Sequence, residues 1–188
     1  MRSANATIRP PGRRAVMAVC AIGAWLAGTL LTARLAGLRV NETASMPRGL
    51  WRVIAADTPL RRGEIVAVCP PETATIREAV VRGYLPAGAC PGGTEPLLKP
   101  VAAIAGDVVT VMQTGVAVDG RPVENTAPLV RDSAGRMLTP MPAGVYPVAR
   151  GEVWLLSGHD PRSFDSRYFG PLPVANVQGV ARPIWVRG

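Results

Sequence analysis

One lysine stands out among the basic residues as a candidate catalytic base. Of the 21 basic residues, 20 are arginine and only Lys99 is lysine. A buried lysine can lose its proton, whereas an arginine stays protonated in proteins. Lys99 lies among apolar neighbours in the segment 96–104 (PLLKPVAAI), where burial would lower its pKa and make it a neutral base. The alternative is a lysine whose charged end reaches the surface.

A base needs a nucleophile, and Ser45 is the candidate. It stands in the segment 44–49 (ASMPRG), where a small residue precedes the serine and Pro47 follows it. Such a segment favours a tight turn that exposes the hydroxyl. Neutral Lys99 would take the Ser45 proton as the serine attacks a peptide carbonyl and forms an acyl-enzyme. Most serines in turns are structural, so this segment alone does not identify a site.

The segment 157–171 (SGHDPRSFDSRYFGP) is the third candidate region. It holds one histidine, two aspartates, three serines and two arginines after an apolar run. This density of polar groups is typical of a functional site or of a fixed ion-pair network. A Ser–His–Asp triad would have to use His159, the only histidine of the chain. We favour the Ser–Lys interpretation because Lys99 supplies a base without it.

These residues follow an apolar segment that is long enough to cross a bilayer. Residues 15–33 carry no charge, and at the helical rise they span roughly 28 Å. The apolar core of a cleaved signal peptide is normally shorter. Four arginines precede the segment, which predicts a cytoplasmic N-terminus. We therefore expect a basic tail at 1–14, a single-pass inner-membrane anchor at 15–34 and a periplasmic domain at 35–188.

The periplasm is oxidising, and this changes how the cysteines are interpreted. Cys69 and Cys90 both lie in the expected periplasmic domain and could form a disulfide, or they could be two buried thiols. Cys20 lies within the apolar segment and is expected to be inert. With one histidine and three cysteines, a zinc site is nearly excluded, and we expect no metal and no cofactor.

Composition excludes several other classes of protein. The chain has 188 residues, of which 48% are hydrophobic, so it is not intrinsically disordered. The net charge is +8, but residues 1–34 contribute +5 and the remaining 154 residues only +3. With 5% aromatic residues, the chain offers little to bind nucleic acid, and we expect no nucleic-acid partner.

The body is predicted to be mostly β, with one short helix, as a single domain. β-prone runs and turn residues predict strands at 50–55, 64–68, 97–104, 107–112, 116–118, 152–156 and 177–186. The spacing of apolar residues predicts a helix at 73–84, and 125–147 is predicted to be a long loop. Trp51, soon after the anchor, could sit at the membrane interface.

Three segments in this order resemble the type I signal peptidases, which are membrane-anchored serine proteases with a Ser–Lys dyad and a β domain. The first is 45–47 (SMP), the second is Lys99 with Gly-Asp at 106–107, and the third is 163–167 (SFDSR). The longer runs SMPRGLW and SFDSRYFG look most like the TraF-like, conjugative-transfer branch of this family. The chain lacks the spacer residue of the usual Ser-Met-x-Pro-Thr pattern, which also favours that branch.

The resemblance implies a role for individual residues. Ser45 matches the nucleophile and Lys99 the general base. The remaining matches are Thr43 with the Ser45 backbone N–H at the oxyanion hole, Ser163 as the hydroxyl that orients the base, and Asp165 and Arg167 as a supporting ion pair. The third important group stays open among His159, Asp160 and Asp165.

The implied function is a serine endopeptidase that removes leader or terminal peptides from exported precursors. Its partners would be the inner membrane and a precursor such as the pilin subunit of a conjugative transfer system, whose product would be linear or cyclic. The alternative is a non-catalytic, membrane-anchored component of a conjugation or secretion complex.

Overall fold

The structure, a computed structural model, describes residues 12–56 and 59–187. The chain divides into two units, Met1–Leu38 and Arg39–Gly188. Most of the predicted basic tail, residues 1–11, lies outside the described residues. In the first unit, helix α1 (Arg13–Leu35) has 23 residues, a mean hydropathy of 1.9 over its most apolar window and no buried residue. By length and composition α1 can cross a membrane.

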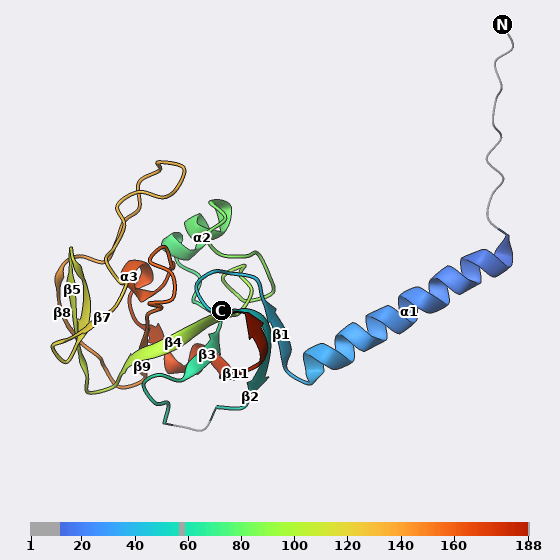
Figure 1. Cartoon of the computed structure of the whole chain (residues 1–188), viewed down its shortest axis with the longest axis horizontal. Helices are drawn as coiled ribbons and strands as arrows, with labels where there is room; N and C mark the ends of the chain where they lie inside the picture. The colour runs from blue at the N-terminus through green and yellow to red at the C-terminus, as the bar shows by residue number, and fades with distance from the viewer. Residues whose placement is uncertain (1–11, 57–58, 188) are drawn as a thin grey trace, which may run out of the picture. The chain divides into compact units, whose positions relative to one another are not determined.

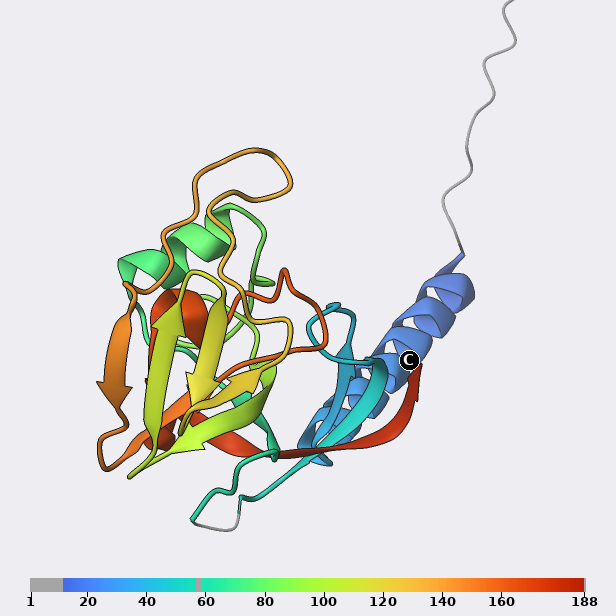
Figure 2. The ribbon, with the colours of Figure 1, turned by 60° about the vertical axis from the view of Figure 1, so that its left-hand side comes forward.

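The second unit contains two β-sheets, drawn in Figures 1 and 2. The larger sheet has seven strands, in the spatial order β1 (Leu38–Asn41), β2 (Arg48–Ile54), β11 (Val177–Arg187), β3 (Ile65–Val68), β4 (Leu97–Ile104), β9 (Glu152–Leu155) and β10 (Leu172–Pro173). The long strand β11 pairs with β3 through its first residues and with β2 through its last. Figure 2 shows it running beside β2 to the C-terminal end.

The smaller sheet has the order β7 (Arg121–Val123), β6 (Gly115–Val118), β5 (Val108–Met112) and β8 (Gly144–Pro147). The tight turn between β6 and β7 has positive φ at Asp119 and Gly120, at 48° and 74°. Such a turn matches the twist of two paired strands, which explains why β6 and β7 form a hairpin. The prediction of a loop over 125–147 is wrong at its end, because 144–147 pairs with β5.

Arg62 joins the two sheets. Its guanidinium contacts the carboxylates of Asp107 and Asp119, and Asp107 also accepts a hydrogen bond from the Ile104 backbone at 2.8 Å. Gly106 and Asp107 lie in the turn between β4 and β5, with φ of 93° at the glycine. This pair therefore builds a turn and an ion-pair connection.

Three apolar clusters fill the second unit. One includes Val66, Val68, Ile76 and Leu155, a second packs the smaller sheet against Trp154, and a third contains Trp51. Trp51 is only 1% exposed and donates from Nε1 to the Pro47 carbonyl at 3.1 Å. The expectation that Trp51 sits at the membrane interface is therefore wrong, because its strand turns this side chain into the core.

The second unit also contains helix α2 and one disulfide. α2 (Ala74–Val81) starts after Thr73, whose side chain accepts a hydrogen bond from Ile76 N at 3.2 Å. The helix ends before Gly83, whose φ is +76°. Ile76 and Ala79 face the core. The structure pairs Cys69 with Cys90 in a disulfide with 5.4 Å between their Cα atoms.

The shortest elements gave no signal in the sequence. They are β1, β7, β10, the four-residue helix α3 (Ser166–Phe169) and the 3-10 turn η1 (Val174–Asn176). Each is too short to show a hydrophobic period, so tertiary contacts alone define it.

Candidate active site

Lys99 lies on the inward face of β4. The strand alternates strictly between buried and half-buried positions, and Lys99 shares the buried side with Leu97 and Val101. It is 3% exposed, and its Nζ donates to Ser163 Oγ at 2.6 Å. Burial lowers the pKa of Lys99 from 10.5 to about 8, because the charged form loses its water. Asp165 opposes this shift, while Arg167 adds to it.

Ser45 stands in the turn between β1 and β2, and one side chain organises that turn. Asn41, which is 7% exposed, donates from Nδ2 to the carbonyls of Thr43, Met46 and Pro47 at 3.0–3.1 Å. Its Oδ1 accepts from Thr43 Oγ1 at 2.8 Å. Five hydrogen bonds in total tie Asn41 to the residues on both sides of Ser45. Sequence reasoning missed Asn41.

The Ser45 hydroxyl lies 3.1 Å from Thr43 Oγ1. Because Thr43 donates its only hydroxyl proton to Asn41 Oδ1, it must accept the proton of Ser45 in this arrangement. Among the described residues, no hydrogen bond joins Ser45 Oγ to Lys99 Nζ. Each of the two groups is held by a neighbouring hydroxyl, and such contacts often tighten only when substrate binds.

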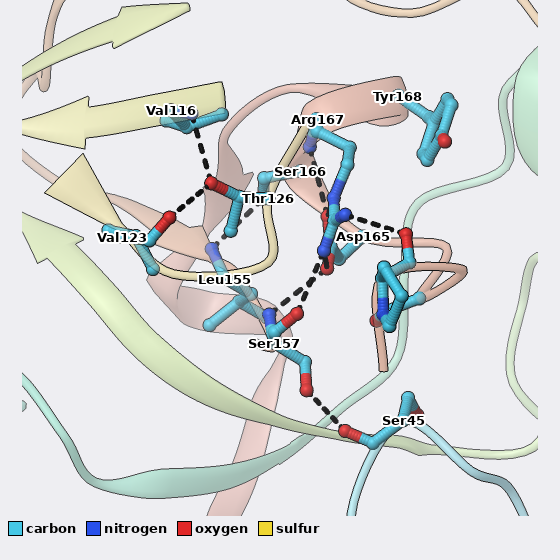
Figure 3. A network of polar contacts seen from close by, with 12 residues as sticks. Ser45, Val116, Val123, Thr126, Leu155, Ser157, Asp165, Ser166, Arg167 and Tyr168 are labelled. Carbon is cyan, nitrogen blue, oxygen red and sulfur yellow. Dashed lines mark hydrogen bonds and ion pairs between the residues drawn. The ribbon is translucent and has the colours of Figure 1, made fainter. Parts of the chain in front are cut away.

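Ser157 connects the Ser45 turn to the polar segment that follows β9. Its Oγ donates to the Ser45 carbonyl, and its backbone N–H donates to Asp165 Oδ2 at 3.0 Å (Figure 3). The same Oγ accepts from His159 N at 3.3 Å. The Ser45 backbone is thus tied to the segment that carries Ser163, the hydrogen-bond partner of Lys99. Ser157 belongs to a region that the sequence singled out, but its role was not predicted.

Asp165 and Arg167 form a fully buried ion pair at the centre of this network (Figure 3). Two parallel bonds of 2.8 Å join the guanidinium to the carboxylate. The other three guanidinium protons reach the carbonyls of Asn125, Pro161 and Ser157 at 2.8–3.1 Å. All five donors of the guanidinium are therefore satisfied. This full set of bonds fixes the segment 157–167, which carries Ser163.

His159 and Asp160 lie at the outer edge of this segment. The side chain of His159 is exposed, and only its backbone joins the network. Burial raises the pKa of Asp160, but hydrogen bonds from Arg162 outweigh it and lower the pKa overall. The Asp160 carbonyl accepts from Ser163 N at 2.9 Å, which helps to place the Ser163 hydroxyl. Of the three candidates for a third group, Asp165 is the one nearest the network's centre.

An aromatic stack supports the same segment. Phe164 stacks on Tyr168 with ring centroids 4.9 Å apart and planes at 3°, and Tyr84 lies 5.4 Å away on another side. Phe164 stands between Ser163 and Asp165, so these rings hold both neighbours in place. This support was also missed. Within the described residues, no group of three or more histidine, cysteine or acidic side chains could hold a metal ion.

Comparisons with known proteins extend these observations. Residues 12–186 match the family described as signal peptidase, peptidase S26. A probable conjugal transfer protein TraF of Sinorhizobium fredii is 46% identical over 159 residues, 84% of this chain and 81% of that protein. The conjugal transfer protein TraF of Agrobacterium fabrum is 41% identical over 174 residues, 92% of this chain and 97% of that protein. A crystal structure of signal peptidase I from Enterococcus faecalis aligns with a TM-score of 0.38 and 20% identity, covering 67% of this chain and 98% of that chain.

The family match spans nearly all of the described chain, and the two relatives cover most of its length well above 30% identity. The mostly β second unit and the apolar N-terminal helix agree with that match. The chain belongs to the signal peptidase, peptidase S26 family.

Proposed function

We propose that this chain is a membrane-anchored serine endopeptidase in which Ser45 is the nucleophile and Lys99 the general base. The observation that carries the proposal is that Lys99 is buried and donates from Nζ to Ser163 Oγ. The segment that contains Ser163 also binds the Ser45 carbonyl through Ser157, which donates to Asp165. With a pKa of about 8, about one lysine in ten is neutral at pH 7. At the ordinary value of 10.5, the neutral fraction would be roughly three in ten thousand.

The reaction begins when the Ser45 hydroxyl turns from Thr43 toward the neutral amine. Lys99 takes the proton, Ser45 Oγ bonds to the substrate carbonyl carbon, and the carbonyl oxygen becomes an oxyanion. The Ser45 N–H would donate to that oxyanion, and the Thr43 hydroxyl would donate too once its proton turns away from Asn41 Oδ1. Such a donor typically contributes about 2.7–4 kcal/mol to the transition state. Lys99 then protonates the leaving amine, and an acyl-enzyme remains.

The fate of the acyl-enzyme defines the product. Attack by water gives a linear chain, with Lys99 again accepting a proton. Attack by the amine at the other end of the same substrate gives a cyclic chain, which is lighter than the linear one by one water. The names of the relatives concern conjugal transfer, which supports a precursor from a conjugation system, and a pilin subunit is the substrate we propose. The N-terminus would lie in the cytoplasm, and the catalytic domain would lie in the periplasm.

The test is co-expression with candidate pilin or other exported precursors from the same replicon. Wild-type enzyme and Ser45→Ala are compared by intact-mass analysis of the precursor. Loss of a leader or terminal peptide only with Ser45 present supports the peptidase, and a further loss of about 18 Da, one water, identifies cyclisation. If a folded enzyme in the membrane changes no precursor in a Ser45-dependent way, the chain is instead a non-catalytic component of the transfer complex.

A further inference from the structure

The strand order of the larger sheet separates Ser45 from Lys99. Ser45 stands just before β2 and Lys99 stands on β4, while β11 and β3 lie between these two strands. Neighbouring strands lie about 4.8 Å apart, so β2 and β4 would be roughly 14 Å apart in a flat sheet. Proton transfer requires the hydroxyl and the amine to lie about 3 Å apart. The position of Ser45 relative to Lys99 therefore depends on contacts other than strand pairing.

The contacts within the Ser45 turn do not supply that connection. Asn41 belongs to β1 and Trp51 to β2, which are the two strands that the turn joins, so their hydrogen bonds shape the turn only internally. Among the described residues, just one residue outside 41–51 forms hydrogen bonds with 43–47. It is Ser157, which donates from Oγ to the Ser45 carbonyl.

Ser157 lies beside Lys99 in the strand pairing. β9 pairs with β4, with Leu155 opposite Val101, and two residues further along this antiparallel register Ser157 falls opposite Lys99. The backbone confirms that the two chains stay together here, because Leu156 N donates to the carbonyl of Pro100 at 3.2 Å. The residue that binds the Ser45 carbonyl is therefore attached to the strand that carries the base.

Ser157 itself is fixed on both sides. It is fully buried, its N–H donates to Asp165 Oδ2 at 3.0 Å, and its carbonyl accepts from Arg167 Nη2 at 2.8 Å (Figure 3). Its Oγ also accepts from His159 N at 3.3 Å. Every hydrogen-bonding group of Ser157 thus has a partner, and its hydroxyl is held in the orientation that reaches the Ser45 carbonyl.

We propose that Ser157 is a positioning residue, which holds the Ser45 turn at the distance from Lys99 that proton transfer requires. This inference rests on the proposed function, in which Lys99 takes the Ser45 proton. Ser157 does not touch the reacting atoms and acts through the Ser45 carbonyl. The same segment holds the Lys99 amine through Ser163, so its two hydroxyls place both members of the dyad.

The test compares Ser157→Ala with wild type, as full chains in detergent or nanodiscs, in steady-state peptide cleavage. A displacement of about 1 Å can lower a rate about 100-fold, so kcat should fall about 10–100-fold while KM changes less than about twofold. The midpoint of the pH profile should stay near 8, because the burial of Lys99 and its bond to Ser163 are unchanged. Ser157→Cys keeps the volume but donates weakly, so its kcat should lie between the two. This variant decides the question if Ser157→Ala does not fold.

Thr126→Val is the matched control. Thr126 is also buried, and its hydroxyl likewise donates to one backbone carbonyl, that of Val123, and accepts from one backbone N–H, that of Val116. It makes no contact with the Ser45 turn. Thr126→Val should therefore lower the melting temperature about as much as Ser157→Ala does, while kcat stays within about twofold of wild type.

Hydrogen–deuterium exchange gives a readout that needs no cleavage. Loss of the hydrogen bond from Ser157 should speed exchange in 41–47 roughly fivefold, whereas 97–104 should stay protected. Thr126→Val should leave exchange in 41–47 unchanged. If wild type cleaves no precursor, the proposed function fails, and the exchange rates still decide whether Ser157 holds the turn.

Four outcomes would overturn the proposal. A Ser157→Ala enzyme with kcat within about twofold of an active wild type would show that the bond does not matter for the reaction. A lower kcat with a shifted pH midpoint would mean that Ser157 acts on Lys99 rather than on Ser45. An equal loss of kcat in Thr126→Val would mean a general effect of stability. Unchanged exchange in 41–47 would mean that the turn is held without Ser157.

Discussion

The pH dependence of peptide cleavage tests the role of Lys99 most directly. If neutral Lys99 is the base, kcat/KM follows the fraction of the amine that has lost its proton. With a pKa of about 8, that fraction rises from about one in ten at pH 7 to about nine in ten at pH 9. The rate should therefore rise about tenfold over this range and level off above it.

An ordinary lysine would give a different curve. With a pKa of 10.5, kcat/KM would rise roughly a hundredfold between pH 7 and pH 9 and would still be climbing at the upper limit. The assay is cleavage of a fluorogenic peptide from the processing site by the full chain in detergent or nanodiscs. A rate that is flat from pH 6.5 to pH 9.5, or one that keeps rising tenfold per pH unit beyond about 9, would refute the reasoning.

Substitution of Lys99 separates its charge from its chemistry. Lys99→Arg keeps a cation that cannot give up its proton, so we expect no measurable cleavage at any pH. Lys99→Met should be equally inactive but more stable. A lysine whose folded pKa lies below its unfolded value weakens the fold at low pH, and the weakening disappears as pH rises from about 8 to 10.5.

The magnitude follows from the same two pKa values. Below pH 8, the free energy of unfolding of Lys99→Met should exceed that of wild type by about 3 kcal/mol, and this difference should shrink toward pH 10.5. Thermal or denaturant unfolding at neutral and alkaline pH measures it. An active Lys99→Arg enzyme would contradict the assignment of the base, and a Lys99→Met protein less stable than wild type at pH 7 would contradict the burial of a charged amine.

Three further predictions concern Arg167, Asn41 and the cysteines. Arg167→Gln leaves a buried carboxylate unpaired and should lower the free energy of unfolding by about 3–5 kcal/mol. It also removes a charge that lowers the pKa of Lys99, so any residual activity should shift to higher pH. Asn41→Ala frees the Ser45 turn and should reduce kcat roughly 10–100-fold with a smaller change in KM, measured by steady-state cleavage. Reduction of the Cys69–Cys90 disulfide should lower the free energy of unfolding by about 2–4 kcal/mol, whereas Cys20→Ser should leave the melting temperature unchanged.

The buried position of Lys99 could be expected from the sequence because it depends on a local pattern. Leu97, Lys99 and Val101 are two residues apart, and a strand sends such residues to one face. Helix α2 could also be predicted, because the spacing of its apolar residues and Gly83 after its end are local signals. Local patterns of this kind account for most of the elements that the sequence predicted correctly.

The residues that hold Ser45 could not be found in the same way. Asn41 acts through three carbonyls of a turn that closes only when β1 and β2 are paired. Ser157 reaches the Ser45 carbonyl across 112 positions of sequence. Phe164 stacks on Tyr168 of α3 and packs at a tilt against Tyr84, which follows α2. Each contact forms between segments that are distant in the sequence, and a single sequence does not show which distant segments will be in contact.

Two tryptophans on the paired strands β2 and β11 show the same limit. Trp51 and Trp185 lie on adjacent paired strands and both look suited to a membrane edge, yet one is 1% and the other 58% exposed. The difference depends on which face of each strand turns inward, and the shift in strand pairing between Pro183 and Trp185 changes that alternation. The error at 125–147 has a related cause, since β8 exists only through its pairing with β5.

The Asp165–Arg167 ion pair affects the pKa of the buried Lys99 in two opposite directions. A lone carboxylate near the amine would stabilise the ammonium form and raise its pKa. Asp165 does act in that direction, but Arg167 acts in the other, and burial remains the largest influence. The pair therefore holds the Ser163 segment, while Arg167 offsets part of the rise in the Lys99 pKa that Asp165 and Asp160 cause. Replacing either member alone disturbs both the support and the proton affinity, so the pair must be considered as one unit of the site.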